Sequence, residues 1–119
     1  MNRIEDSIQS SCVNWFRLQY PGLMLLSFPA GYVFGGNKTK RAIIGKRMKN
    51  MGYTVGTADL FLAMPSAIYH GLFIEMKTAK GRQSPAQKDF ERRALMSGYG
   101  YAICRSVEEF METINGHLK

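Results

Sequence analysis

The chain has 119 residues, of which 45% are hydrophobic and 21% are charged, and this composition predicts one folded domain over residues 1–119 and excludes a disordered chain. No apolar run approaches the roughly 18 residues that a membrane span needs, and the N-terminal residues lack the apolar core of a signal peptide, so we expect a cytoplasmic protein without a membrane partner. The formal net charge of +7 favours a polyanionic partner such as nucleic acid.

The first part of the chain predicts a helix, a strand and a loop. Asn2-x-x-Glu5 has the pattern of a capping box, and apolar residues follow at helical spacing to about Leu18. The apolar run Leu23–Phe28 predicts a buried strand. Residues 30–37, which contain three glycines, predict a loop.

The positive charge of the chain is concentrated in residues 38–51, because no Asp or Glu occurs between Asp6 and Asp59. Apolar residues at helical spacing in this segment predict a helix with a positive outer face. Its basic residues are Lys38, Lys40, Arg41, Lys46, Arg47 and Lys49. We expect them to contact the phosphates of DNA, and the alternative is a solvated face that only keeps the protein soluble.

The second half of the chain predicts a hairpin, a helix, a strand and a last helix. Residues 59–64 and 72–78 are two strand-like runs joined by a short turn, which predicts an antiparallel hairpin. Residues 99–104 predict another strand, and Ser106-x-x-Glu109 caps a last helix. The resulting order of helices and strands predicts an α/β fold, in which a mixed central sheet is flanked by helices.

Residues 84–87, with the pattern Ser-Pro-x-Gln, predict the start of the helix between the hairpin and the next strand. We expect Phe90, Ala94 and Leu95 to face the sheet from this helix.

Neither the cysteines nor the histidines form a pattern that predicts a metal site. Cys12 and Cys104 stand in apolar surroundings and are expected to be buried free thiols. His70 and His117 have no partner pattern and are expected at the surface.

The residues with the strongest chemical potential lie on the predicted hairpin. Side chains alternate along a strand, so Glu75 and Lys77 share one face, about 7 Å apart. Asp59 opens the preceding strand and is expected beside Glu75. Two neighbouring carboxylates repel each other, and a divalent cation removes this repulsion by binding their oxygens. The pattern therefore predicts a Mg²⁺ site, with Lys77 placed to orient a water or to neutralise charge on a phosphate.

A simpler interpretation of Glu75 and Lys77 is an exposed ion pair on a solvated strand, which contributes little energy. The pattern Glu-x-Lys alone is common. The metal site is favoured by the combination of Gly56-x-x-Asp59 before one strand, Glu75-x-Lys77 on the next, and a capped helix after them.

These motifs resemble those of the PD-(D/E)XK nuclease superfamily, and within it the virus-type replication-repair nuclease family, VRR-NUC. The resemblance extends over nearly the whole chain. It rests on an acidic residue in the first helix (Glu5), on G-x-x-D at residues 56–59, on E-x-K at residues 75–77 and on S-x-x-Q at residues 84–87. Ala58 occupies the place of the proline in the superfamily name, and since that proline offers no metal-binding atom, its absence changes little.

The resemblance implies a restriction-endonuclease-like core and a metal-dependent active site. Asp59, Glu75 and the backbone carbonyl of Met76 would bind Mg²⁺, for which Mn²⁺ would substitute, and Lys77 would be the catalytic lysine. Glu5 would hold a second metal or reach the first through water. Gln87 would also belong to the site. Each of these two residues has an alternative role as the N3 residue of a helix capping box.

The resemblance further implies a DNA endonuclease that acts as a homodimer on branched DNA and resolves Holliday junctions. Tyr32, Phe34 and residues 43–48 are plausible material for the dimer interface. Three alternatives stay open: a non-catalytic basic DNA-binding module, a flap or duplex nuclease of the same fold, and a restriction-type endonuclease, for which 119 residues leave little room.

Overall fold

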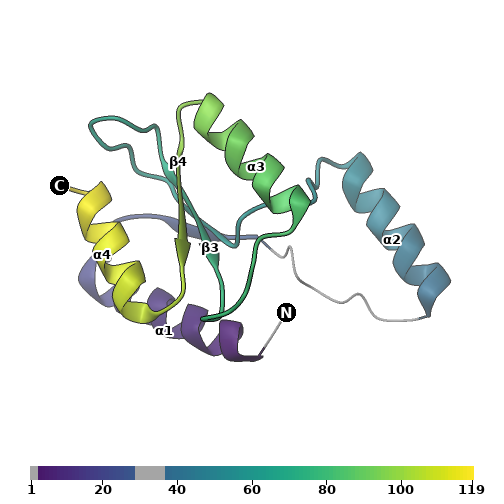
Figure 1. The fold of residues 1–119 in the computed structure, drawn as a ribbon, viewed down its shortest axis with the longest axis horizontal. Helices are drawn as coiled ribbons and strands as arrows, with labels where there is room; N and C mark the ends of the chain where they lie inside the picture. The colour runs from purple at the N-terminus through teal and green to yellow at the C-terminus, as the bar shows by residue number, and fades with distance from the viewer. Residues whose placement is uncertain (1–2, 29–36) are drawn as a thin grey trace.

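A computed structural model describes residues 3–28 and 37–119 of the chain. The predicted order of helices and strands is confirmed (Figure 1). The elements are α1 (Arg3–Gln19), β1 (Leu25–Ser27), α2 (Lys38–Asn50), β2 (Leu60–Leu62), β3 (Leu72–Met76), α3 (Pro85–Met96), β4 (Gly100–Cys104) and α4 (Val107–His117). Apart from Asn37, the loop predicted at residues 30–37, including Tyr32 and Phe34, lies outside the described residues.

The strands form one mixed sheet in the order β1-β2-β3-β4. β2 and β3 form the predicted antiparallel hairpin, with Leu60 opposite Ile74, and β4 runs parallel to β3. The prediction of a buried strand over Leu23–Phe28 is wrong in its burial, because β1 is short, lies at the edge of the sheet and leaves Leu26 and Ser27 exposed. In this strand order β3 is an interior strand, with β2 on one side and β4 on the other.

Helices α1 and α4 cover one face of the sheet, as the lower left part of Figure 1 shows. Alternation along β3 sends Leu72, Ile74 and Met76 into this layer. The buried core consists of these residues together with Cys12, Phe16, Leu60, Leu62, Cys104, Phe110 and Ile114. Burial of this apolar surface is the main force that holds α1 and α4 to the sheet.

The opposite face of the sheet carries an aromatic cluster below α3. The ring of Phe73 lies 4.6 Å from that of Phe61, 5.0 Å from that of Phe90 and 5.6 Å from that of Tyr99. Ala94 is buried, as predicted, but Leu95 is exposed, contrary to the prediction. α3 contacts the sheet along a narrow strip, so the residue next to Ala94 on the helix already points to solvent.

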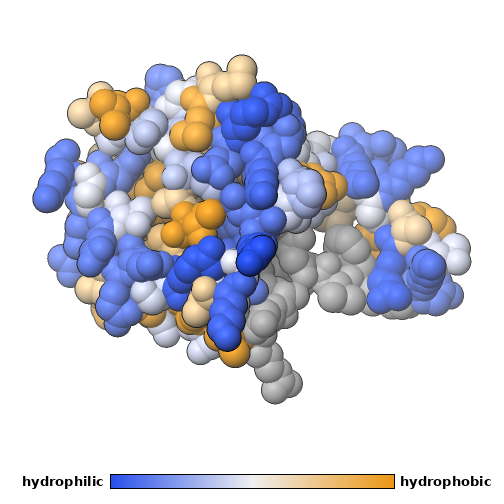
Figure 2. Space-filling model, in the orientation of Figure 1, coloured by the Kyte–Doolittle hydropathy of each residue, from blue (hydrophilic) through white to orange (hydrophobic). Residues whose placement is uncertain are grey.

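Helix α2 stands apart from the sheet and its covering helices (Figure 1). Asn37 caps its N-terminus by accepting a hydrogen bond from the backbone N–H of Lys40. No side chain of α2 is buried, and Ile43 keeps 56% of its surface exposed. The helix and its basic residues are confirmed, yet its apolar residues are exposed or only half-buried. The residues of α2, at the right of Figure 2, are mainly hydrophilic and are drawn in blue.

Cys12 and Cys104 are buried free thiols, as predicted, whereas the surface position predicted for His117 is wrong. His117 is only 9% exposed, and its Nε2 lies 2.6 Å from the carbonyl oxygen of Met64. This contact joins α4 to the segment after β2. Among residues 3–28 and 37–119, no helix is both long and apolar enough to cross a membrane.

Candidate active site

A tight turn before β2 places Asp59. Gly56 has a φ of +87°, and a Cβ at this position would lie 2.4 Å from the carbonyl oxygen of Ala86 in the first turn of α3. Glycine is needed here both for the left-handed backbone and for the close approach. Ala58, just before Asp59, is fully buried and packs in the interior. The turn thus fixes the start of β2 against α3.

Asp59 lies at the start of β2 and is tied to β3 by its side chain. The hairpin register, with Leu60 opposite Ile74, brings Asp59 to the level of Glu75. Its Oδ2 accepts a hydrogen bond of 2.7 Å from the backbone N–H of Met76. The predicted proximity of Asp59 to the Glu75–Lys77 segment is therefore present in the structure.

Glu75 is a carboxylate buried on the interior strand, with 1% of its surface exposed. Its Oε1 accepts a hydrogen bond from the hydroxyl of Tyr101 on β4. Its Oε2 is buried and makes no hydrogen bond, and the ammonium of Lys77 lies 3.6 Å from it. The side chain of Lys77 is only 14% exposed, so the exposed ion pair considered from the sequence does not describe this pair.

The electrostatics of Asp59 reflect a crowded acidic site. Burial, reinforced by the negative charges of Glu75 and Glu5, raises the pKa of Asp59 to about 6. The N–H of Met76 and the charge of Lys77 act in the opposite direction but do not compensate. The ionised form of Asp59 is therefore disfavoured unless a further positive charge is present.

Glu5 lies on α1, half-buried, and its charge acts on Asp59. Within residues 3–28 and 37–119, however, no three His, Cys, Asp or Glu side chains are close enough to hold a metal together. The structure thus brings Asp59 and Glu75 together, but Glu5 is too far away to bind one metal ion together with both of them.

Gln87 forms the capping box of α3. Its Oε1 accepts a hydrogen bond of 2.8 Å from the backbone N–H of Ser84, while its own N–H donates to the Ser84 hydroxyl. The backbone of Gln87 also borders the Gly56 turn. Its observed contacts are those of a helix cap beside the site, the alternative role that the sequence offers for this residue.

The six basic residues predicted to contact DNA all lie on α2, and all are exposed. None of the ion pairs found in the described residues involves α2, so its positive charge is not neutralised by nearby carboxylates. These residues form a separate basic surface and do not enter the site around Asp59 and Glu75.

Two residues of the site region were missed from the sequence. Tyr101 hydrogen-bonds Glu75, and burial together with this hydrogen bond raises the pKa of its phenol above the usual range, so that it stays a donor. Arg105 donates from Nη1 to the carbonyls of Thr78 and Gly81, at 2.7 Å each, and thereby fixes the turn that follows Lys77. Both come from the β4 region, and only its parallel pairing with β3 brings them here.

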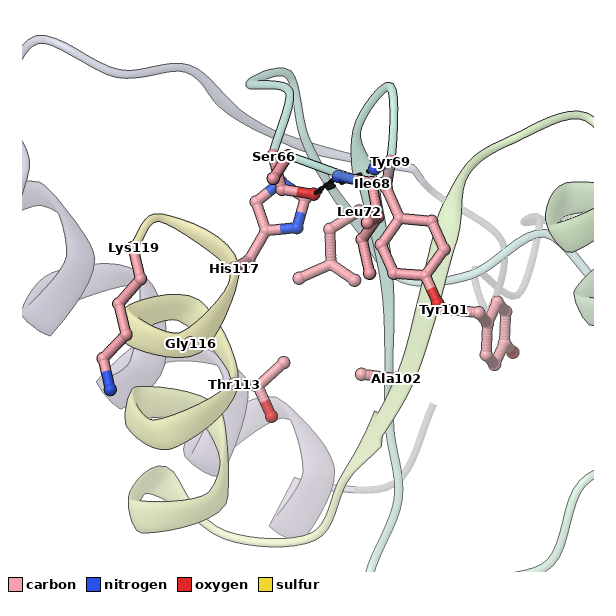
Figure 3. Close-up of a pocket in the computed structure, with 11 residues that line it drawn as sticks. Ser66, Ile68, Tyr69, Leu72, Tyr101, Ala102, Thr113, Gly116, His117 and Lys119 are labelled. Atoms are coloured by element: carbon pink, nitrogen blue, oxygen red, sulfur yellow. Dashed lines mark hydrogen bonds between the residues drawn. The ribbon is translucent and has the colours of Figure 1, made fainter.

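A hollow of about 400 Å³ lies elsewhere, between β4, the segment around residues 66–69 and the C-terminal end of α4 (Figure 3). Leu72 and Ala102 give it apolar walls, and His117 borders it from α4. None of Asp59, Glu75 or Lys77 lines it, but Tyr101, which hydrogen-bonds Glu75, also borders the hollow.

The oxygens of the acidic site fit a hard divalent cation. Glu75 Oε2 is a buried acceptor that has the Lys77 ammonium 3.6 Å away but accepts no hydrogen bond, a state that costs free energy. The raised pKa of the neighbouring Asp59 means that its negative charge is poorly compensated, and a bound cation would compensate it. Mg²⁺ prefers one or two carboxylates, completed by water, backbone oxygen or phosphate. The carboxylates of Asp59 and Glu75 are ligands of this kind.

Two comparisons with known proteins give a match. The model of the VRR-NUC domain family matches residues 4–108. A solved structure of a VRR_NUC domain protein superposes with a TM-score of 0.75 and 22% identity, covering 95% of this chain and 86% of that chain, which shows a shared fold. The comparison with curated proteins gives no match. With the family model covering most of its length, the chain belongs to the VRR-NUC family and has a nuclease-type fold.

Proposed function

We propose that this protein is a Mg²⁺-dependent deoxyribonuclease. Its active site, formed by Asp59, Glu75 and Lys77, would hydrolyse the phosphodiester bonds of DNA. The observation that carries the proposal is the buried Oε2 of Glu75, which accepts no hydrogen bond. It lies beside a second carboxylate whose pKa is raised and 3.6 Å from a largely buried lysine ammonium. If Glu75 and Lys77 formed only a structural ion pair, the second carboxylate, Asp59, would not be needed beside them.

The chemistry follows from the positions of these groups. Asp59 and Glu75, with the Met76 carbonyl, would hold the cation, which when bound supplies Lewis acidity toward a phosphate and lowers the pKa of water. The Lys77 ammonium is placed to orient the attacking water, or to donate hydrogen bonds to phosphate oxygens as negative charge grows in the transition state. Mn²⁺ satisfies the same oxygen ligands and would replace Mg²⁺.

DNA is the substrate that the charge distribution favours. Six exposed Lys and Arg side chains on α2 face solvent without carboxylate partners in the described residues. A cationic surface of this kind attracts the phosphate backbone independently of sequence. Binding through α2 and cleavage at Asp59 and Glu75 would therefore be functions of separate parts of the molecule.

Branched DNA and a homodimer complete the proposal. A single active site cuts one strand at a time, whereas a four-way junction has a two-fold symmetry that a C₂ dimer matches. On α2, Ile43 is exposed and available for a subunit contact. The proposal is a resolvase that nicks two strands of a junction.

The first prediction concerns catalysis. Lys77→Ala and Glu75→Gln should each lower kcat by about 100- to 1000-fold, because each removes a group that acts on the transition state or holds the cation. DNA binding should change little. The measurement is single-turnover cleavage of a labelled junction with Mg²⁺, at matched folding. Lys88→Ala on α3 and Glu112→Gln on α4, both exposed, are the matched controls. Near-wild-type turnover by Lys77→Ala or Glu75→Gln contradicts the site, and wild-type protein that binds DNA without cutting any substrate indicates a non-catalytic binding module.

The second prediction concerns the pH dependence of stability. The folded protein raises the pKa of Asp59 to about 6, so the protonated carboxyl is more stable in the folded than in the unfolded chain. The contribution of Asp59 to the free energy of unfolding is therefore fully present below about pH 4 and is lost as the pH rises through about 6. Asp59→Asn should therefore stabilise the metal-free protein at pH 8, by on the order of 1–2 kcal/mol after allowance for solvent screening.

Urea unfolding in EDTA at pH 4 and pH 8 measures this difference. The gain should vanish at pH 4, and added Mg²⁺ at pH 8 should stabilise the wild type but not Asp59→Asn. An equal effect of the substitution at both pH values would remove the acidic site from the explanation.

The third prediction concerns α2. Neutralising Lys46, Arg47 and Lys49 together should weaken binding to every DNA sequence and reduce the log–log salt slope by up to about three units, since each phosphate contact contributes about 0.9. Fluorescence anisotropy over a salt series measures the slope. The fold should persist, because no side chain of α2 is buried.

The control for this variant removes the same charge from α3, by neutralising Lys88, Arg92 and Arg93, which are also exposed. If both triple variants change the slope equally, only net charge matters and α2 has no special role.

The fourth prediction concerns assembly. The protein should be a homodimer in solution and should cut a mobile four-way junction at nearly symmetric positions on two strands. Light scattering gives the mass, and sequencing gels map the cuts. A monomer that cuts flaps or single strands faster than junctions contradicts the resolvase proposal and leaves the nuclease site intact.

A further inference from the structure

The carboxylate of Glu75 has two oxygens in different environments. Oε1 accepts the hydrogen bond of the Tyr101 hydroxyl, whereas Oε2 has no hydrogen bond and lies 3.6 Å from the Lys77 ammonium. An ionised carboxylate can only accept hydrogen bonds, and a phenol has one proton to donate. The Tyr101 proton is therefore directed to Oε1, and Oε2 is the oxygen left for a cation.

Tyr101 belongs to a chain of hydrogen bonds in which Gln83 donates to Tyr101 and Tyr101 donates to Glu75. The Nε2 of Gln83 lies 3.0 Å from Oε1 of Glu91 on α3 and 3.4 Å from the Tyr101 hydroxyl oxygen. An amide nitrogen has two protons, so one is donated to Glu91 and the other to Tyr101. Because Tyr101 accepts from Gln83, its own proton is kept for Glu75.

The ring of Tyr101 is fixed by the sheet and by α3. The parallel register places Tyr101 opposite Phe73, two residues before Glu75 on β3. The ring also packs near Phe90 of α3, with 6.3 Å between the ring centres. Its hydroxyl is consequently directed at Glu75 by two rigid elements.

We infer that Tyr101 is a positioning residue that makes Glu75 a one-oxygen ligand and so favours Mg²⁺ and Mn²⁺ over Ca²⁺ at the site. The inference rests on the proposed metal site. Mg²⁺ takes six ligands in a tight octahedron, whereas Ca²⁺ takes six to eight and often binds both oxygens of a carboxylate. With Oε1 occupied by Tyr101, Glu75 offers the geometry that the smaller ion prefers.

Tyr101→Phe tests this inference, because it removes one hydroxyl and keeps the ring. Partners of metal ligands commonly change metal affinity by about 10- to 100-fold when they are removed. We expect Mn²⁺ and Mg²⁺ to bind about 10-fold or more weakly. Ca²⁺ should lose less, or gain, because Oε1 becomes available to it. The ratio of the Kd for Ca²⁺ to the Kd for Mg²⁺ should fall.

The measurement is Mn²⁺ binding followed by electron paramagnetic resonance, with Mg²⁺ and Ca²⁺ as competitors, on the full chain without DNA. Tyr20→Phe is the matched control: the Tyr20 hydroxyl donates to Asn115 Oδ1 at 2.5 Å, and Tyr20 packs against Trp15 on the α1 side of the sheet. Gln83→Leu, which removes the donor to Tyr101, should shift the ratio in the same direction but less, and it serves if Tyr101→Phe folds poorly.

The outcomes separate this inference from the proposed function. A lower ratio of the Kd for Ca²⁺ to the Kd for Mg²⁺ in the Tyr101 or Gln83 variant supports the positioning role of Tyr101. A ratio that stays unchanged, because both ions weaken equally or neither changes, assigns Tyr101 a purely structural role and overturns it. Wild-type protein that binds none of the three ions overturns the proposed metal site itself.

Discussion

The burial of the Glu75 carboxylate on an interior strand is the constraint on which the site depends. Only 1% of this side chain is exposed, and water cannot compensate its charge there. Tyr101 satisfies one oxygen, Lys77 lies near the other, and Asp59 adds a second negative group whose pKa is raised. A hard cation between the two acids would satisfy both at once. The same strand sends its alternate residues into the core, so the position of Glu75 is fixed by the packing of the whole sheet.

Signals that act over a few residues were predictable from the sequence. The Ser84 to Gln87 pattern predicted the start of α3, and the structure contains the full capping box. The alternation over residues 72–77 predicted that Glu75 and Lys77 share one face of the strand, where they form an ion pair. The hairpin, with its short connection, brought Asp59 next to Glu75 as expected. In each case the determining interactions join residues that are close in sequence or paired across one turn.

Features that depend on contacts between distant segments were not predictable. Tyr101 reaches Glu75 only because β4 pairs with β3 in parallel, and no local pattern specifies that pairing. His117 was expected at the surface, yet a hydrogen-bonding contact with the Met64 carbonyl buries it. The helical spacing in residues 38–51 predicted a helix with a positive outer face, but no side chain of α2 is fully buried in the structure. Periodicity predicts the helix, and tertiary contact decides whether its apolar side is used.

The central claim is that Asp59 and Glu75 jointly bind a divalent cation. The most direct test is a crystal of the protein soaked in Mn²⁺, with anomalous diffraction recorded near the manganese edge. The account predicts a peak within about 2.0–2.3 Å of an Asp59 oxygen and of Glu75 Oε2, with the remaining positions filled by a backbone oxygen and water. A site that stays empty at saturating Mn²⁺, or a peak bound by other residues only, would contradict the account.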